Sequence, residues 1–393
     1  MKNDDKNRPP LKPATRLIRS GRDKRITGQF VNPPVIHAST VLFDTVEDML
    51  HGRQPYSYGR WGTPTSQAFE SAMSELEGAD GTVLCPSGLS AATTALLSVL
   101  GAGDRILITD SVYGPVRRFA TVILKNIGVD VVYYDPLIGA GIEAMFTPNT
   151  RAVYVEAPGS LTFEMQDVPA ISAAAKRHGI TVLIDNTWAT PIHFRALDFG
   201  ADISIISGTK YIVGHSDVML GTVAAKGPAW KRLHEVHRFL GLHVGPDDMY
   251  LGLRGLRTMA IRLERHAQSA MTVARWLQTR PEVSRVLYPP LETDPGHALW
   301  KRDMKGASGL FGFVFKGRSY DQAKPFIDHL QLFGIGASWG GFESLITLND
   351  PAPIRTATTW SAEGALIRLH IGLEDPADLI ADLEAAFAQL AAG

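Results

Sequence analysis

Short apolar runs alternate with helical patterns along the chain from about residue 65 onwards. Phe69, Met73 and Leu76 recur at helical spacing. We expect Thr65 to cap this helix and Gly78 to end it. Continuous apolar strands that alternate with helices are typical of a mostly parallel sheet covered on both faces, so the pattern predicts an α/β fold. The strand-like runs lie at residues 82–85, 105–109, 129–134, 152–156, 180–184, 203–206 and 221–224.

The two ends of the chain differ from this central region. Residues 1–60 show no sustained periodicity, which predicts an extended arm lying across the same chain or a neighbouring subunit. Residues 228–279 are almost wholly helical in pattern. Two strand-like runs and a closing amphipathic helix follow, at residues 309–315, 365–371 and 376–390. We therefore expect an arm, a large domain and a smaller α+β domain, with bounds at 1–60, 61–255 and 256–393.

Composition narrows the class of protein. The 393 residues are 45% hydrophobic and 20% charged, as in globular proteins of two or three domains. The formal net charge of −1 argues against nucleic-acid binding, and no apolar stretch approaches the roughly 20 residues that span a bilayer. The N-terminus is polar and lacks the apolar core expected of a secretory signal, and the single Cys85 excludes an internal disulfide. We expect a cytoplasmic enzyme that binds neither nucleic acid nor membrane.

Charged and hydroxyl side chains follow two consecutive predicted strands. One strand ends at Asp185, and the next is followed by Ser207, Thr209 and Lys210. One strand–helix–strand step separates the aspartate from the lysine, so both should reach the same edge of the sheet. A partly buried lysine is costly unless its amine is used. A Schiff base to pyridoxal 5′-phosphate (PLP) would use it, with Asp185 as partner of the pyridinium nitrogen.

Other residues suit the remaining parts of that cofactor. The segment Pro86-Ser-Gly-Leu-Ser90 follows a strand and opens a helix, where backbone N–H groups bind anions and Gly88 allows a phosphate to approach. Tyr113 follows another strand and is placed to stack on the ring. Taken singly, each residue has an ordinary explanation: Asp185 as a helix cap, Lys210 as a surface lysine and Gly88 as a turn. Their conjunction at the strand ends of one sheet supports the cofactor site.

The segment Ser207-Gly-Thr-Lys210-Tyr-Ile-Val-Gly-His-Ser-Asp217 resembles the lysine signature of the Cys/Met-metabolism family of PLP-dependent enzymes. The resemblance extends from about residue 15 to 391 and implies the fold type I of PLP-dependent transferases. It implies that Lys210 carries the cofactor, that Asp185 pairs with the pyridinium nitrogen and that Tyr113 stacks on the ring, all three being catalytic. By the same resemblance the phosphate is bound by Gly88, Leu89, Ser207 and Thr209.

Two further implications concern the substrate and the assembly. Arg368 would hold the α-carboxylate of an amino-acid substrate near Ser338, for which a planar guanidinium is suited. The segment Tyr58-Gly-Arg60 resembles one that crosses to a neighbouring subunit and completes its phosphate site. The resemblance therefore implies a homo-oligomer, a tetramer built as a dimer of dimers with shared active sites.

Two segments resemble β-acting rather than γ-acting members of the family. In the loop that starts at Glu156, the γ-enzymes carry an Asn–Pro pair near Gly159 and Ser160. Trp339 stands where they have Leu, and it would shape the substrate pocket. The resemblance implies a carbon–sulfur β-lyase of methionine biosynthesis that cleaves L-cystathionine and also acts on cystine-like substrates. Arg238, where some bacterial β-lyases have a tyrosine, leaves recognition of the distal group open.

Alternatives from other classes remain at this point. A γ-acting relative, such as a cystathionine γ-synthase or methionine γ-lyase, would share every cofactor residue. A nucleotide-dependent Rossmann enzyme would need G-x-G-x-x-G after an early strand, whereas residues 85–90 contain one glycine. A non-enzymatic binding protein would not need the lysine, aspartate and arginine together. No metal is expected, because His234 and His237 are three residues apart rather than the four of H-E-x-x-H.

Overall fold

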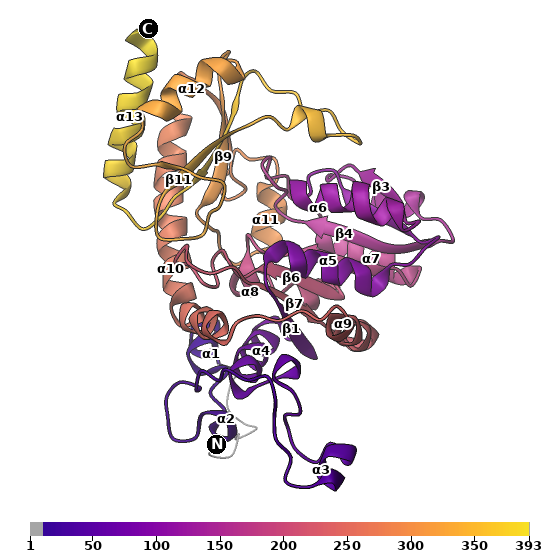
Figure 1. The fold of residues 1–393 in the computed structure, drawn as a ribbon. Coiled ribbons are helices and arrows are strands. Elements are labelled where there is room, and N and C mark those ends of the chain that lie inside the picture. The colour runs from indigo at the N-terminus through magenta and orange to yellow at the C-terminus, as the bar shows by residue number, and fades with distance from the viewer. Residues whose placement is uncertain (1–10, 393) are drawn as a thin grey trace.

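The computed structural model describes residues 11–392, so the first ten residues of the predicted arm lie outside the described chain. Within this range the central sheet has seven strands in the order β1-β7-β6-β5-β4-β2-β3 (Figure 1). Strand β7 runs antiparallel to both of its neighbours, and the remaining pairs are parallel. The predicted mostly parallel α/β fold is confirmed. The strands are β1 (Gly81–Cys85), β2 (Arg105–Thr109), β3 (Asp130–Tyr134), β4 (Thr150–Glu156), β5 (Thr181–Asp185), β6 (Ile203–Ser207) and β7 (Gly221–Ala225).

Both faces of the central sheet are covered. Along β4, Val153 and Val155 pack into one buried cluster, whereas Ala152 and Tyr154 pack into another on the opposite face. This alternation explains why the strands are apolar at consecutive positions. The helices of this part are α4 (Pro64–Glu77), α5 (Gly88–Val99), α6 (Gly114–Phe119), α7 (Val168–Arg177), α8 (Thr190–His193) and α9 (Gly227–Phe239), with the short helices η2 (Ala120–Leu124), η3 (Gly139–Met145) and η4 (Ala196–Phe199).

The C-terminal part contains a second sheet. Its five strands in the described chain have the order β10-β11-β12-β9-β8. Strands β9 (Leu310–Phe315) and β12 (Leu366–His370) confirm the two predicted apolar runs. Three further strands were not predicted, because they are short or carry polar residues on an accessible face: β8 (Val283–Leu287), β10 (Gly334–Ile335) and β11 (Leu345–Asn349). The helices here are α10 (Pro246–Gln278), α11 (His297–Asp303), α12 (Tyr320–His329), η5 (Ala352–Ile354) and α13 (Pro376–Ala392).

One predicted helix limit was wrong. Helix α4 begins at Pro64 with Thr63 as its N-cap, because Thr63 and Ser66 form a reciprocal capping box. Thr65 instead donates its hydroxyl to the carbonyl of Pro34, at 2.7 Å. The run at residues 228–279 is almost wholly helical, as predicted, and consists of two helices, α9 and α10, separated by residues 240–245. The expected boundary between residues 255 and 256 falls inside α10 and stays a prediction.

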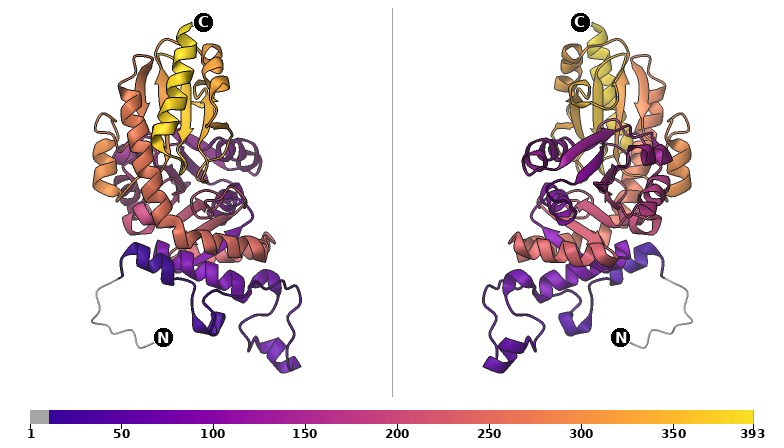
Figure 2. Two further views of the ribbon diagram at one scale, coloured as in Figure 1. Left: turned by 90° about the vertical axis from the view of Figure 1, so that its left-hand side faces the viewer. Right: turned by 90° about the vertical axis from the view of Figure 1, so that its right-hand side faces the viewer.

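The N-terminal segment is less extended than expected. It contains α1 (Pro13–Arg19), α2 (Lys24–Thr27), α3 (Val46–His51) and η1 (Gly59–Trp61). Leu17 is buried against α4 and α10, whereas the stretch around α3 projects away from the body of the molecule (Figure 2). Phe30 and Leu42 of the N-terminal segment are 81% and 85% exposed. No helix between residues 11 and 392 is both long and apolar enough to cross a membrane.

One buried carboxyl group makes the stability of this fold depend on pH. Glu77 at the end of α4 is fully buried, and its Oε1 accepts a hydrogen bond from Ser204 Oγ at 3.0 Å. Burial raises the pKa of Glu77 to about 8, whereas a Glu in an unfolded chain titrates near ~4.3. Ionisation therefore destabilises the folded protein progressively as the pH rises from about 5 to about 8.

We predict that Glu77→Gln removes this penalty. Its melting temperature should exceed that of the wild type by about 2–4 °C at pH 8 and match it at pH 5. Calorimetry across this pH range measures the difference, with the exposed Glu292→Gln as the matched control. A difference between Glu77→Gln and wild type that is the same at every pH would contradict the assignment.

Candidate active site

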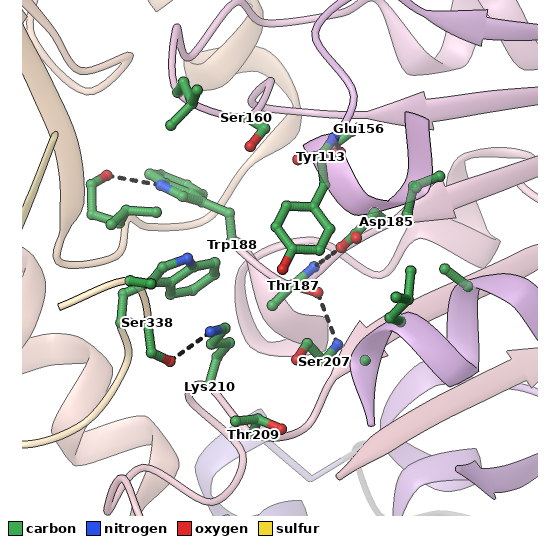
Figure 3. Close-up of a pocket in the computed structure, with 18 of the residues that line it drawn as sticks. Tyr113, Glu156, Ser160, Asp185, Thr187, Trp188, Ser207, Thr209, Lys210 and Ser338 are labelled. Atoms are coloured by element: carbon green, nitrogen blue, oxygen red, sulfur yellow. Dashed lines mark hydrogen bonds between the residues drawn. The ribbon is translucent and has the colours of Figure 1, made fainter. Parts of the chain in front are cut away.

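A cavity of about 470 Å³ lies at the carboxyl edge of the central sheet (Figure 3). Loops that follow β1, β2, β4, β5 and β6 form most of its wall, as expected for ligand sites in parallel sheets. Residues 337–339 and Arg368 close it from the second sheet. All the predicted site residues line this cavity except Tyr58 and Arg60. Those that do are Gly88, Leu89, Tyr113, Asp185, Ser207, Thr209, Lys210, Ser338, Trp339 and Arg368.

Lys210 presents its amine to this cavity just after β6. Its Nζ donates to Ser338 Oγ at 2.6 Å and lies 5.4 Å from the centre of the Trp339 ring. Burial lowers the pKa of Lys210 to about 8, helped by the positive charge of Arg368 and opposed by the negative charge of Asp185. The amine can therefore take up and release a proton near neutral pH.

Asp185 is the last residue of β5, and the loop that follows this strand fixes its carboxylate by a hydrogen bond. Its Oδ1 accepts a hydrogen bond from the backbone N–H of Thr187 at 3.0 Å. The Thr187 hydroxyl in turn accepts from the backbone N–H of Ser207 at 2.9 Å, which ties the ends of β5 and β6 together. Burial raises the pKa of Asp185, and Thr187 and Lys210 act in the opposite direction. A cation that pairs with this carboxyl group would favour its ionised form.

The N-terminus of α5 forms the other end of the cavity. Ser87 caps this helix by accepting from Ser90 N at 3.1 Å. A Cβ at Gly88 would come within 2.4 Å of Ser207 Oγ, so only glycine lets the helix end approach β6 this closely. Thr209 is engaged differently from the prediction, because its hydroxyl donates to Leu220 O and accepts from Leu220 N. It would have to turn to donate to an anion.

Tyr113 is held by a residue for which no role was predicted. Glu156 ends β4, and its Oε2 accepts the backbone N–H of Tyr113 at 2.7 Å. Burial raises the pKa of Glu156 well above its ordinary value, and so does the charge of Asp185, its partner in the strand register. Glu156 ends a strand as Asp185 does, so the same strand-end argument would have found it.

The second sheet contributes a guanidinium group. Arg368 on β12 donates through Nη2 to Ala337 O at 2.9 Å and to Ser338 O at 3.3 Å. Burial lowers the pKa of Arg368 to about 10, so it stays charged at neutral pH. His370, two residues further on, places its Nε2 3.2 Å from Gly341 O. Both side chains thus hold the loop that carries Trp339.

One wall of the cavity is a strained loop after β4. Leu161 and Phe163 have φ angles of 68° and 58°, a left-handed conformation that side chains other than glycine rarely adopt. Ser160 N donates to Ser111 O at 2.8 Å, which joins this loop to the one after β2. Figure 3 shows Ser160 and Trp188 across the cavity from Ser207 and Thr209. Trp188 and Thr187 also line the cavity, although no role was predicted for them.

Tyr58 and Arg60 lie away from this cavity. Arg60 Nη1 donates to the carbonyl of Arg238 at 2.9 Å, on the side of the molecule formed by α4 and α9. The Arg238 guanidinium lies 4.4 Å from the centre of the Trp61 ring, and Tyr58 packs edge-on against that ring. Their expected contribution to a neighbouring subunit's site remains a prediction.

Comparison with known proteins gives the family. Residues 14–388 match the Cys/Met metabolism PLP-dependent enzymes. The chain belongs to this family. A Rhizobium johnstonii protein provisionally named cystathionine beta-lyase is 54% identical, with 96% of each chain covered. The cystathionine beta-lyase of Escherichia coli K12 is 44% identical over 96% of this chain and 98% of its own. The structure of a cystathionine gamma synthase from Xanthomonas oryzae has a TM-score of 0.89 at 33% identity, covering 98% and 100%.

The residues present fit the cofactor of this family. Lys210 would supply an amine for the aldehyde of PLP, and the Asp185 carboxylate would supply an anion for its ring nitrogen. The close approach of Gly88 to Ser207 leaves the N-terminus of the twelve-residue α5 facing the cavity, where a phosphate is stabilised. Tyr113 offers its ring between these two ends.

The opposed charges around Lys210 lead to a prediction on the cofactor-free protein. Arg368→Leu should raise the pKa of Lys210 above about 8, because it removes a nearby cation. Asp185→Asn should lower it, because the carboxylate stabilises the ammonium form. Competitive acetylation at several pH values, read by peptide mass spectrometry, measures both shifts. Shifts of the same sign in the two variants would contradict this electrostatic account.

Proposed function

We propose that the protein is a PLP-dependent carbon–sulfur β-lyase that converts L-cystathionine and water to L-homocysteine, pyruvate and ammonia. The observation that carries the proposal is the 44–54% identity to proteins named as cystathionine beta-lyases, against 33% for the gamma synthase. Trp339 and the loop at Gly159 and Ser160 support it, since both resemble the β-acting enzymes and both line the cavity. Cystine-like substrates belong to the same proposal.

The proposed roles follow from the contacts of each side chain. Arg368 gives up its hydrogen bonds to the carbonyls of Ala337 and Ser338 and donates instead to the α-carboxylate of the substrate. The PLP ring, when bound, withdraws electrons from the substrate α-carbon. Asp185 keeps a proton on the ring nitrogen, which strengthens that withdrawal. Lys210, with its pKa near 8, accepts the proton from the α-carbon.

The remaining site residues position the cofactor and the substrate. Gly88, Leu89 and Ser207, with Thr209 once its hydroxyl turns, would bind the phosphate. Tyr113, anchored by Glu156, would stack on the ring. Residues 61–255 would thus carry the cofactor, while residues 256–393 would supply the substrate contacts Ser338, Trp339 and Arg368. The cytoplasmic location expected from the sequence is part of this proposal.

Product analysis tests the proposed reaction. The wild type incubated with L-cystathionine should release pyruvate and homocysteine, whereas γ-cleavage would give 2-oxobutyrate and cysteine. Lys210→Ala should lower pyruvate release by at least about 10³-fold, because it removes both the cofactor amine and the base. Borohydride reduction of the wild type should fix the cofactor on the peptide that contains Lys210. Turnover of Lys210→Ala at the wild-type rate would refute the assignment.

We further infer a homotetramer, a dimer of dimers in which Tyr58 and Arg60 complete the phosphate site of a neighbouring subunit. The exposed apolar side chains of the N-terminal segment, among them Phe30 and Leu42, support this because a second copy would bury them. In the single chain Arg60 contacts Arg238 rather than the cavity.

Mixing two inactive variants tests whether sites are shared. Arg60→Ala and Lys210→Ala should each be weakly active or inactive alone, yet regain activity when co-expressed. In a mixed dimer one site receives both intact residues and the other receives neither. We expect about a quarter of wild-type activity from random pairing, because half of the dimers are mixed and each has one intact site. Activity no greater than the average of the two variants would exclude shared sites.

A further inference from the structure

The connection between β11 and β12 is much longer than their pairing requires. These strands are antiparallel neighbours in which Asn349 pairs with Leu366, and residues 350–365 join them. Two to five residues usually suffice for such a hairpin. Figure 1 shows this connection leaving the second sheet and reaching over the central sheet near α6. Long ordered connections of this kind are usually functional. We call residues 350–365 the crossing loop.

The crossing loop is anchored on a buried carboxylate of the central sheet. Asp110, directly after β2, accepts the backbone N–H groups of Thr356, Ala357 and Thr358 at 2.8–3.2 Å. The Arg117 guanidinium also donates to it. Although burial alone would raise the pKa of Asp110, these hydrogen bonds hold it below its ordinary value. The carboxylate therefore stays charged and keeps the crossing loop in place.

Arg355 extends from this anchor to the cavity wall. Its side chain is only 3% exposed, and its Nη2 donates to Glu164 Oε1 at 2.9 Å and to the Thr162 hydroxyl. The Thr162 hydroxyl also bonds Glu164 Oε2, at 2.5 Å. A guanidinium this deeply buried is tolerated only when it is paired, and removing either partner leaves an uncompensated charge.

Glu164 in turn closes the strained part of the cavity wall. Its backbone carbonyl accepts from Gly159 N at 2.9 Å, and the N–H of Phe163 donates to Gly159 O at 3.0 Å. Between these bonds Leu161 and Phe163 hold their left-handed conformations. Such conformations persist only where the surroundings impose them. Arg355 supplies part of that constraint from the second sheet.

We propose that Arg355 is a positioning residue, which holds the wall at residues 159–163 against the sulfur-linked substituent of the substrate. This inference rests on the proposed function. Lys210 and Arg368 fix the α-carbon and carboxylate, and the cofactor would take the side of Ser207. Ser160 lies across the cavity from Ser207 (Figure 3), so the substituent extends towards this wall.

Substrates with long and short substituents distinguish positioning of the substituent-binding wall from a general effect of Arg355 on the active site. Arg355→Met, Glu164→Gln and the double variant should each raise KM for L-cystathionine about tenfold, with kcat within about twofold of the wild type. For β-chloro-L-alanine, whose substituent is a single atom, both constants should stay unchanged. The double variant should be no worse than either single one, because all three break the same interaction.

A matched control contacts the same crossing loop at a different place. Arg285 donates to Ser361 O at 2.9 Å and lies 5.0 Å from the Trp360 ring. Arg285→Met should therefore keep wild-type constants for both substrates. Hydrogen–deuterium exchange gives a readout independent of catalysis. Exchange in the peptide covering residues 157–167 should accelerate at least about fivefold in Arg355→Met and remain unchanged in Arg285→Met.

Three results would overturn the proposal. They are an equal rise in KM for both substrates, additive effects in the double variant, or unaltered exchange in the wall peptide. If Arg355→Met does not fold, Glu164→Gln and Arg355→Lys decide the same question, with a smaller rise expected for the lysine. A wild type that cleaves neither substrate would refute the proposed function, and the exchange measurement would still decide the role of Arg355.

Discussion

The active-site cavity depends on the register of three parallel strands. Pairing sets Glu156 of β4 opposite Asp185 of β5, and Asp185 opposite Ile205, two residues before β6 ends. The strands therefore end at nearly the same level, and the following loop brings Lys210 to that edge. A shift of one residue would turn these side chains to the other face of the sheet. The two buried clusters on either face oppose such a shift, because both need the present alternation.

Desolvation shifts the pKa of the ionisable groups at this edge of the sheet. It lowers the pKa of Lys210 and raises those of Asp185 and Glu156, so each group is moved towards its neutral form. Hydrogen bonds and opposite charges restore part of the charged state, as Thr187 does for Asp185. The pKa of Lys210 near 8 is the consequence, and it would suit the proposed role of this amine, which is to bind a carbonyl and to move a proton.

The sequence was informative where a local rule applied. Asp185 and Lys210 were predictable because both follow apolar strands, and Gly88 because it opens a helix after one. Trp339 and Arg368 came from resemblance, since the second sheet that presents them could not be placed from its pattern. Glu156 was missed although it ends a strand.

Contacts between segments that are distant in the sequence could not be predicted from it, for a physical reason. Asp110 meets Thr356, Ala357 and Thr358, and Arg355 meets Glu164, across separations of about 190–250 residues. No local periodicity in the sequence predicts such pairs, because they form only once the two sheets pack against each other. The cap of α4 was misplaced at Thr65 because the reciprocal pairing of Thr63 with Ser66 depends on backbone geometry rather than residue type alone.

The negative charge of the PLP phosphate connects the composition of the cavity with the proposed oligomer. Near the N-terminus of α5 the cavity of the described chain offers hydroxyl and backbone N–H donors, and its cationic lining residues are Lys210 and Arg368. Lys210 would bind the aldehyde and Arg368 the substrate, which leaves a group of nearly two negative charges opposed by neutral donors alone. Arg60 of the same chain is directed elsewhere, because its guanidinium donates to the carbonyl of Arg238 in α9. In the proposed oligomer, Arg60 of a second copy would supply a cation to this phosphate.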